Sequence, residues 1–147
     1  MTDDNNPIAP AAVYDLVGSD GFNQLVDRFY QRVAEDDILR PMYPKGDLAP
    51  AARRLCLFLE QYFGGPTTYM QERGHPRLRA RHMHFPIDQL ARDRWVELMD
   101  AAITEADFAA DIQAVLREYF EMAATFLMNQ HPAQGGMFSA SYPNNNA

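Results

Sequence analysis

Apolar residues recur at helical spacing through most of this chain. The clearest run follows the pattern i, i+3, i+4, i+7, i+8 and i+11, in Phe22, Leu25, Val26, Phe29, Tyr30 and Val33. Stripes of similar period run from Ala51 to Tyr62, from Trp95 to Ile103 and from Phe108 to Leu127. Such spacing places the residues on one face of a helix, whereas a strand would need strict alternation, which we do not find. The sequence therefore predicts an all-α fold.

Capping residues and helix breakers set the predicted boundaries. Ser19 and Asp20 can cap the first helix, 64–66 (Gly-Gly-Pro) cannot continue the second, and Asp88 can cap the helix that holds Trp95. We expect a weak short helix over 11–17, a turn of helix near Tyr69, and a short helix that starts at Pro76 and ends near 83. The segment 85–87 is expected to be extended because the residue before a proline avoids the helical region. The last helix is predicted over 107–129, with an inner face formed by Phe108, Ile112, Val115, Leu116, Tyr119, Ala123, Phe126 and Leu127.

The length of 147 residues corresponds to one domain. We place this domain at 10–130, between an N-terminal extension, 1–9, and a C-terminal tail, 131–147. Both ends are rich in polar and turn-forming residues, so we expect them to be flexible. With 47% apolar residues the domain can form a core that encloses a ligand.

The charge balance bears on partners and location. Acidic residues outnumber basic ones by 20 to 13, and without a cluster of Lys and Arg this argues against nucleic acids and anionic membranes as partners. One cysteine, Cys56, excludes an internal disulfide framework and Cys-rich metal sites. The polar start lacks the features of a signal peptide, and no apolar run approaches 18 residues. We therefore expect a soluble cytoplasmic protein.

The histidines are the first candidates for chemistry. His131 lies in the tail and is set aside, whereas His82 ends the predicted short helix, four residues after Leu78. An imidazole offered beside apolar surface suits an axial metal ligand, although a histidine at a helix C-terminus is also favoured by the helix dipole alone. Other metal sites have weaker support, because Glu72-x-x-His75 has no second copy and His82 and His84 point apart.

Three polar aromatic residues form a second pattern. Tyr30 and Trp95 lie on the inner stripes of two helices, and Tyr43 lies in a proline-flanked corner. Buried tyrosine and tryptophan need partners for their O–H and N–H groups. They are either ordinary core residues with local hydrogen bonds or donors that converge on a small polar ligand in an apolar cavity.

These residues lie within segments that together resemble one family, the group II truncated haemoglobins. The resemblance covers roughly 13–129, and its segments are Phe29-Tyr30-Gln31-Arg32-Val33-Ala34-Glu35-Asp36, Pro41-Met42-Tyr43-Pro44, Phe58-Leu59-Glu60-Gln61-Tyr62-Phe63-Gly64-Gly65-Pro66, Gly74-His75-Pro76-Arg77-Leu78-Arg79-Ala80-Arg81-His82, and Phe85-Pro86-Ile87 through Arg94-Trp95. It implies a truncated globin-like two-over-two helical sandwich around a haem, with haem b (iron protoporphyrin IX) as the cofactor.

The resemblance also implies roles for individual residues. His82 matches the proximal iron ligand, and Tyr30, Tyr43 and Trp95 match the distal residues that stabilise the ligand. Ala51 and Leu55 match distal-helix positions that offer no hydrogen bond. The residues that match the haem contacts are Leu55, Phe58, Leu59, Leu78, Phe85 and Trp95, and Arg81 and Tyr69 are candidates to meet the propionates.

The implied function is the binding of O2, CO, NO or another diatomic ligand, with oxygen transport among the family's uses. Two or three donors should slow oxygen release by about ten- to thousand-fold, since each 1.4 kcal/mol is a factor of ten. Slow release favours chemistry on the ligand, such as NO dioxygenase or peroxidase-like activity with electrons from a reductase. The alternatives are a haem-based redox or gas sensor that acts through a separate partner, and a helical bundle without haem in which His82 only caps its helix. The chain is expected to be a monomer or a homodimer.

Overall fold

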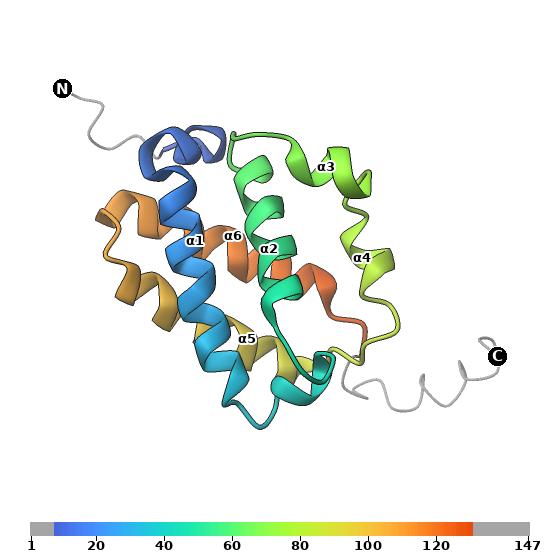
Figure 1. Ribbon diagram of the computed structural model, residues 1–147. Helices are drawn as coiled ribbons and strands as arrows, with labels where there is room; N and C mark the ends of the chain where they lie inside the picture. The colour runs from blue at the N-terminus through green and yellow to red at the C-terminus, as the bar shows by residue number, and fades with distance from the viewer. Residues whose placement is uncertain (1–7, 131–147) are drawn as a thin grey trace.

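The computed structural model describes residues 8–130, and within them every regular element is a helix, so the all-α prediction is confirmed (Figure 1). The predicted flexible ends fall outside these residues, apart from 8 and 9. Described in chain order, the elements are η2 (Pro10–Ala12), α1 (Val13–Ala34), η3 (Arg40–Met42), α2 (Ala49–Tyr62), α3 (Thr68–Arg73), α4 (Leu78–Arg81), α5 (Gln89–Ala106) and α6 (Ala110–Leu127).

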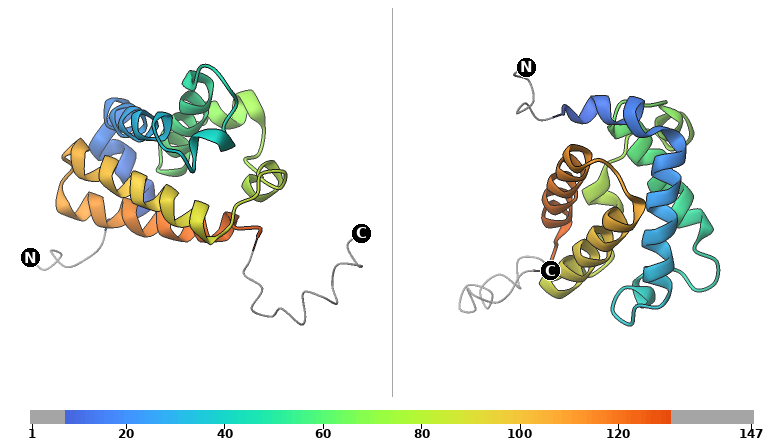
Figure 2. Two further views of the ribbon diagram at one scale, coloured as in Figure 1. Left: turned by 90° about the horizontal axis from the view of Figure 1, so that it is seen from below. Right: turned by 90° about the vertical axis from the view of Figure 1, so that its left-hand side faces the viewer.

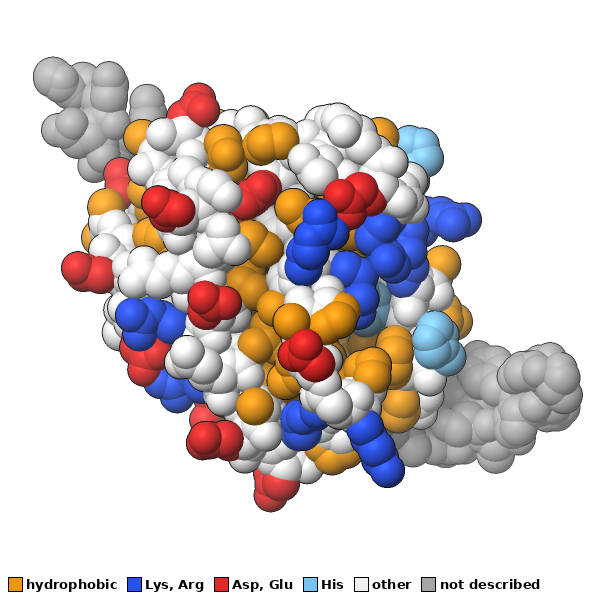
Figure 3. All heavy atoms as spheres, viewed as in Figure 1, with side chains coloured by type: hydrophobic (Ala, Val, Ile, Leu, Met, Phe, Trp, Pro, Cys, Tyr) orange, Lys and Arg blue, Asp and Glu red, His pale blue; other side chains and the backbone are white. Residues whose placement is uncertain are grey.

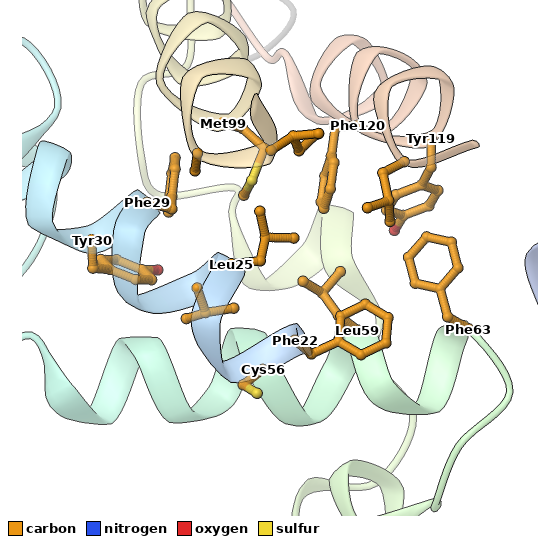
Figure 4. Close-up of a cluster of buried hydrophobic side chains, with 14 of the residues drawn as sticks. Phe22, Leu25, Phe29, Tyr30, Cys56, Leu59, Phe63, Met99, Tyr119 and Phe120 are labelled. Carbon is orange, nitrogen blue, oxygen red and sulfur yellow. The ribbon is translucent and has the colours of Figure 1, made fainter. Parts of the chain in front are cut away.

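The four long helices form two layers. α1 packs on α2 in one layer and α5 packs on α6 in the other, and the layers meet chiefly where α1 packs on α5 (Figure 2). Their shared core is rich in large apolar side chains, among which Phe22, Phe29, Leu59, Met99 and Phe120 converge from different helices (Figure 4). This is the predicted two-over-two arrangement, and it leaves α3 and α4 to one side of the layers.

α1 is kinked at a single glycine. The backbone is non-helical at Gly18, where φ is 70°, a value that glycine adopts at little cost, so two helical segments meet there. The predicted weak helix over 11–17 lies before this kink, and the helix predicted to start near Ser19 lies after it. The Ser19 hydroxyl donates to Glu60 Oε2 of α2, at 2.8 Å.

The end of α2 lies against the start of α1. α2 ends at Tyr62, before the predicted 64–66 breaker, and Gly64 follows with φ of 99°. A Cβ at Gly64 would lie 1.9 Å from the carbonyl oxygen of Ala11, and a Cβ at Gly65 would lie 2.6 Å from the ring of Tyr14. Glycine at both positions therefore lets the two chain segments approach, and Tyr14 N donates to Phe63 O at 2.9 Å.

Two predicted helix boundaries were wrong. α4 starts at Leu78 rather than Pro76, because Arg77 takes a left-handed conformation with φ of 40° and interrupts the helix at its predicted start. α6 covers 110–127 rather than 107–129, because Asp107 is also left-handed, with φ of 64°, and ends α5. By contrast, Asp88 caps α5 as predicted, accepting a hydrogen bond from Ala91 N at 2.9 Å.

The predicted inner face of α6 is wrong at its end. Phe126 is 53% exposed, whereas Phe120, which was left out of the predicted face, is buried. The neighbour of Phe126 is Arg79 of α4, whose guanidinium lies 5.1 Å from the ring centroid. The spacing of apolar residues could not show that the short polar helix α4, rather than a helix of the core, lies next to Phe126.

Candidate functional site

The site is built around His82, the residue that ends α4. Its Nδ1 lies 2.7 Å from the carbonyl oxygen of Leu78. Because a carbonyl can only accept, Nδ1 carries the proton and the lone pair of Nε2 is left free. A histidine that donates one ring N–H to a carbonyl and presents the other nitrogen has the form of a metal ligand held in one orientation.

Asn129, just beyond α6, holds the chain that follows His82. Its Nδ2 donates to the carbonyl oxygens of His82, at 3.1 Å, and of Phe85, at 2.9 Å. Its Oδ1 accepts from Ile87 N at 2.9 Å, and its own backbone N donates to Ile87 O at 3.0 Å. Sequence reasoning missed this residue, although an asparagine at the end of the last helix, at the limit of the family resemblance, was a signal that could have been followed.

The structure brings together the hydroxyl-bearing residues predicted for the distal side. The rings of Tyr30 and Tyr43 meet edge to face with centroids 5.6 Å apart. Burial raises the pKa of Tyr30, and the neighbouring Tyr43 raises it further. Burial also raises the pKa of Tyr43, although the neighbouring Tyr30 and Trp95 partly offset this. Both tyrosines therefore keep their protons at neutral pH.

Trp95 connects this pair to the core. Its ring lies 4.9 Å from that of Phe29 and 5.6 Å from that of Phe120, measured between centroids, while its side chain is only partly buried. The indole thus packs on the core and also lies next to Tyr43. Tyr30, Tyr43 and Trp95 form one network that spans α1, the segment after η3, and α5.

Apolar side chains beside this network are packed against the core but not covered by it. They are Leu55 and Phe58 of α2 and Leu98 of α5, and the predicted contacts Leu78 and Phe85 near α4 are also only partly buried. Figure 3 shows hydrophobic side chains around a hollow beside α2 and α4, with Lys and Arg along its edge. Leu59 differs, because it is completely buried in the core.

The two candidates for the propionates occupy different surroundings. Arg81 donates to the carbonyl oxygens of Pro76, at 2.7 Å, Arg73, at 2.9 Å, and His75, at 3.3 Å. Tyr69 is buried and meets Phe58 edge to face at 5.7 Å between centroids. Arg81 is thus held near His82 by the backbone, whereas Tyr69 packs beneath the rim of the hollow.

The residues present fit an iron porphyrin. Such a group is a large apolar disc with an anionic edge, which needs apolar walls, one axial nitrogen and nearby cations. The free Nε2 of His82, the incompletely covered apolar side chains and the guanidinium of Arg81 supply these three features. No group of three or more His, Cys, Asp or Glu in residues 8–130 could hold a metal ion directly. The fold and the site together define a globin-type haem protein.

Comparison with known proteins makes this assignment specific. The family described as bacterial-like globin matches residues 12–129. Group 2 truncated hemoglobin YjbI of Bacillus subtilis is 41% identical over 123 residues, which cover 84% of this chain and 92% of that protein. The crystal structure of the hemoglobin from the thermophilic phototroph Chloroflexus aurantiacus is 46% identical, covers 80% of this chain and 98% of that one, and superposes with a TM-score of 0.78.

A further solved structure is that of the truncated oxygen-avid haemoglobin of Bacillus subtilis, 40% identical, with coverage of 83% and 100% and a TM-score of 0.77. The chain belongs to the bacterial-like globins, and its structural relatives include group II truncated haemoglobins. Membership of this family implies a haem cofactor and the binding of diatomic gas ligands such as O2. Within residues 8–130, no helix has the length and apolar character required to cross a bilayer.

Proposed function

We propose that this protein binds haem b through His82 Nε2 and holds O2 with hydrogen bonds from the Tyr30, Tyr43 and Trp95 network. When bound, the haem supplies the iron to which a diatomic ligand attaches. The observation that carries the proposal is the clustering of these three polar aromatic residues, in which the ring centroids of Tyr30 and Tyr43 lie 5.6 Å apart. Their O–H and N–H groups are donors that a ligand in the hollow can accept from.

Ring packing orients these donors before the ligand arrives. Tyr30 packs on Tyr43, and Trp95 packs on Phe29 and Phe120, so binding costs little reorganisation of the pocket. A neutral hydrogen bond contributes about 1 kcal/mol net, and more when the acceptor carries charge. Removing one donor should therefore speed ligand escape by roughly five- to hundred-fold. Slow release suits chemistry on the ligand better than delivery.

The first experiment tests the cofactor. Absorption spectra of the purified ferric, ferrous and carbon-monoxide forms should show a Soret band for the natural protein. We expect His82→Ala to lose the spectrum of a histidine-ligated haem, while His84→Ala, a change at an exposed neighbour, should retain it. Unchanged pigment uptake and spectra in His82→Ala would contradict the proposed ligand.

The second experiment tests the network. Trp95→Phe keeps an aromatic ring on the core but removes the indole donor, and Tyr43→Phe removes the hydroxyl. We expect both to raise the oxygen dissociation rate measured by stopped flow, because each removes one donor from the distal side. An unchanged rate in both variants would exclude the network from ligand binding.

We further propose that tightly held oxygen is used for turnover of NO or peroxide in the cytoplasm, with electrons from a separate reductase. Consumption of NO by the oxygenated protein, sustained by a reductase, would support this enzyme-like role. A haem-based sensor is the other interpretation, and a partner that binds only the liganded or only the unliganded form would favour it instead.

A further inference from the structure

Four arginines lie within nine residues immediately before the proposed haem ligand. They are Arg73, Arg77, Arg79 and Arg81, and they correct the sequence-based view that the chain has no basic cluster. Three of the four are exposed and Arg81 is partly buried. We call Arg73, Arg77, Arg79 and Arg81 the basic rim.

The basic rim differs from most of the other arginines in its partners. Those of α1, α5 and α6 form ion pairs, which include Arg28 and Arg32 with Glu105, Arg92 with Asp93 and Glu121, Arg94 with Asp36 and Glu97, and Arg117 with Asp100. In the described part of the chain no carboxylate lies within ion-pair distance of the basic rim. Although the chain has seven more acids than bases, these four neighbouring cations thus have no carboxylate partner among residues 8–130.

Contacts to neutral groups hold the basic rim in place. Arg81 donates to three carbonyls, Arg79 Nη1 donates to Phe126 O at 2.8 Å, and the guanidinium of Arg73 lies 5.8 Å from the centroid of Tyr69. Carbonyls and aromatic rings orient a guanidinium without neutralising its charge. The positive charge therefore remains available to a partner.

The charge around the site is opposite to that of the whole chain. Between Asp47 and Asp88 the sequence holds six arginines and two acidic residues, a net charge of +4 in a chain of −7. The two propionates of a bound haem would offset only half of this excess. Figure 3 shows Lys and Arg side chains along the edge of the hollow.

Apolar side chains next to the basic rim add a surface that a protein can bury. Met83, just after α4, is 61% exposed, and Phe126, which Arg79 contacts, is 53% exposed. Met70 of α3 is 39% exposed. Large apolar side chains beside arginines are typical of protein–protein interfaces.

We propose that the basic rim docks an acidic flavoprotein of the flavodoxin type, which delivers one electron to the haem at this edge. The proposal rests on the haem function proposed above. In the step, an anionic flavin hydroquinone loses one electron and becomes the neutral semiquinone, the ferric iron becomes ferrous, and no proton moves. An acidic protein is favoured over a nucleic acid because the remaining surface of the chain is strongly negative and would repel an extended polyanion.

The dependence of the reduction rate on ionic strength distinguishes two effects. One is attraction between the basic rim and the acidic partner, and the other is repulsion between the negative net charges of the two proteins. Two proteins of negative net charge should react faster as salt screens their repulsion, whereas docking through the basic rim should make the reaction slower. The measurement is stopped-flow reduction of the ferric holoprotein by an acidic flavodoxin hydroquinone. For the natural protein we expect the second-order rate constant to fall about tenfold between low and physiological ionic strength.

A pair of double variants controls for net charge. Arg73→Gln with Arg77→Gln removes two charges from the basic rim, whereas Arg28→Gln with Lys45→Gln removes two elsewhere. At low ionic strength we expect the first to slow reduction three- to tenfold and the second to change it less than twofold. A small neutral flavin should reduce both double variants at the natural rate, because that reaction does not depend on docking.

Several results would overturn the assignment. A natural rate constant that rises with salt, or equal effects of the two double variants, would contradict docking at the basic rim. Binding of single-stranded DNA or phosphatidylserine vesicles at physiological salt, lost in the Arg73/Arg77 variant, would reassign the surface to another partner. A protein with no Soret band would contradict the proposed haem function, whereas normal spectra without the salt effect would contradict only the docking surface.

Discussion

At the scale of single residues, the orientation of His82 depends on two groups outside its imidazole. The Leu78 carbonyl sets which ring nitrogen is free, and Asn129 fixes the backbone that carries the ring. Asn129 lies 47 positions away in the sequence, so the proposed ligand His82 is held jointly by α4 and the end of α6. A disturbance at the end of α6 should therefore reach the His82 imidazole without contacting it.

We predict that Asn129→Ala weakens haem retention, because the segment 82–87 loses its side-chain hydrogen bonds to the end of α6. Loss of about 1.4 kcal/mol would speed haem transfer to an excess of apomyoglobin roughly tenfold. The iron–histidine stretching band in resonance Raman spectra should also shift. Gln130→Ala is the control, and Asn129→Asp, which keeps only the acceptor for Ile87 N, should fall between. A normal stretching band in Asn129→Ala would contradict a positioning role.

Cys56 illustrates how burial sets reactivity at one residue. Burial, followed by the nearby Glu60 carboxylate, raises the pKa of the Cys56 thiol to about 12. At pH 8 only about one thiol in ten thousand is then ionised, and the thiolate is the reactive form. We expect native protein to react with a thiol reagent such as DTNB far more slowly than urea-unfolded protein. Equal rates would show that the thiol is accessible and ionised in the native fold.

At the scale of elements, glycines decide how closely α1 and α2 can approach. Gly64 is required by two separate features, its positive φ and the Ala11 carbonyl against which a Cβ would collide. Gly46 has a similar φ of 91° but open space around it. The two positions therefore separate the cost of the backbone conformation from the cost of the collision.

We predict that Gly64→Ala lowers the free energy of unfolding by more than about 2 kcal/mol, since the backbone must move as well as adopt an unfavourable φ. Gly46→Ala should cost only about 1 kcal/mol, the conformational part alone. Urea unfolding of both variants, followed by far-UV circular dichroism, measures the difference. Equal losses would show that the two segments can separate without cost.

At the scale of the whole molecule, a buried carboxylate contributes to the contact between the two helical layers. The buried Asp36, just after α1, accepts from Ile38 N, from Leu39 N and from Arg94 of α5. Burial by itself would raise the pKa of Asp36, but these hydrogen bonds outweigh it and bring the pKa below its ordinary value of 3.8. The folded state favours the charged form of Asp36. The contribution of this carboxylate to stability is therefore complete above its pKa in the unfolded chain, and it is lost as pH falls through its pKa in the folded protein.

We therefore predict that Asp36→Asn destabilises the protein by about 1–2 kcal/mol at pH 7, a magnitude typical of hydrogen bonds to a partly screened charge. The difference from the natural protein should shrink below pH 4 as the natural carboxyl becomes protonated. Urea titrations at several pH values test this, with Asp37→Asn at the exposed neighbour as the control. A difference that stays constant down to pH 2 would exclude the carboxylate as its source.

Sequence alone determined the helical class, the C-terminal end of α2 and the start of α5, because periodicity, glycine, proline and a capping aspartate act over a few residues. It also indicated Tyr30, Tyr43, Trp95 and His82, since polar groups on apolar stripes need partners. The predicted roles of Leu59 and Arg81 remain predictions, although Leu59 lies wholly within the core and Arg81 already bonds three carbonyls.

Only the tertiary structure showed that Asn129 holds the segment after His82, that Phe126 is exposed, and that four arginines share one rim without carboxylates. Each of these depends on which distant segments become neighbours, and local spacing carries no information about that. The start of α4 is a further example. Pro76 predicted a helix that begins at that proline, but Arg77 is left-handed and α4 begins two residues later, at Leu78. Interactions between residues close in sequence determined where the helices form. Packing between segments distant in sequence determined which residues surround the His82 imidazole.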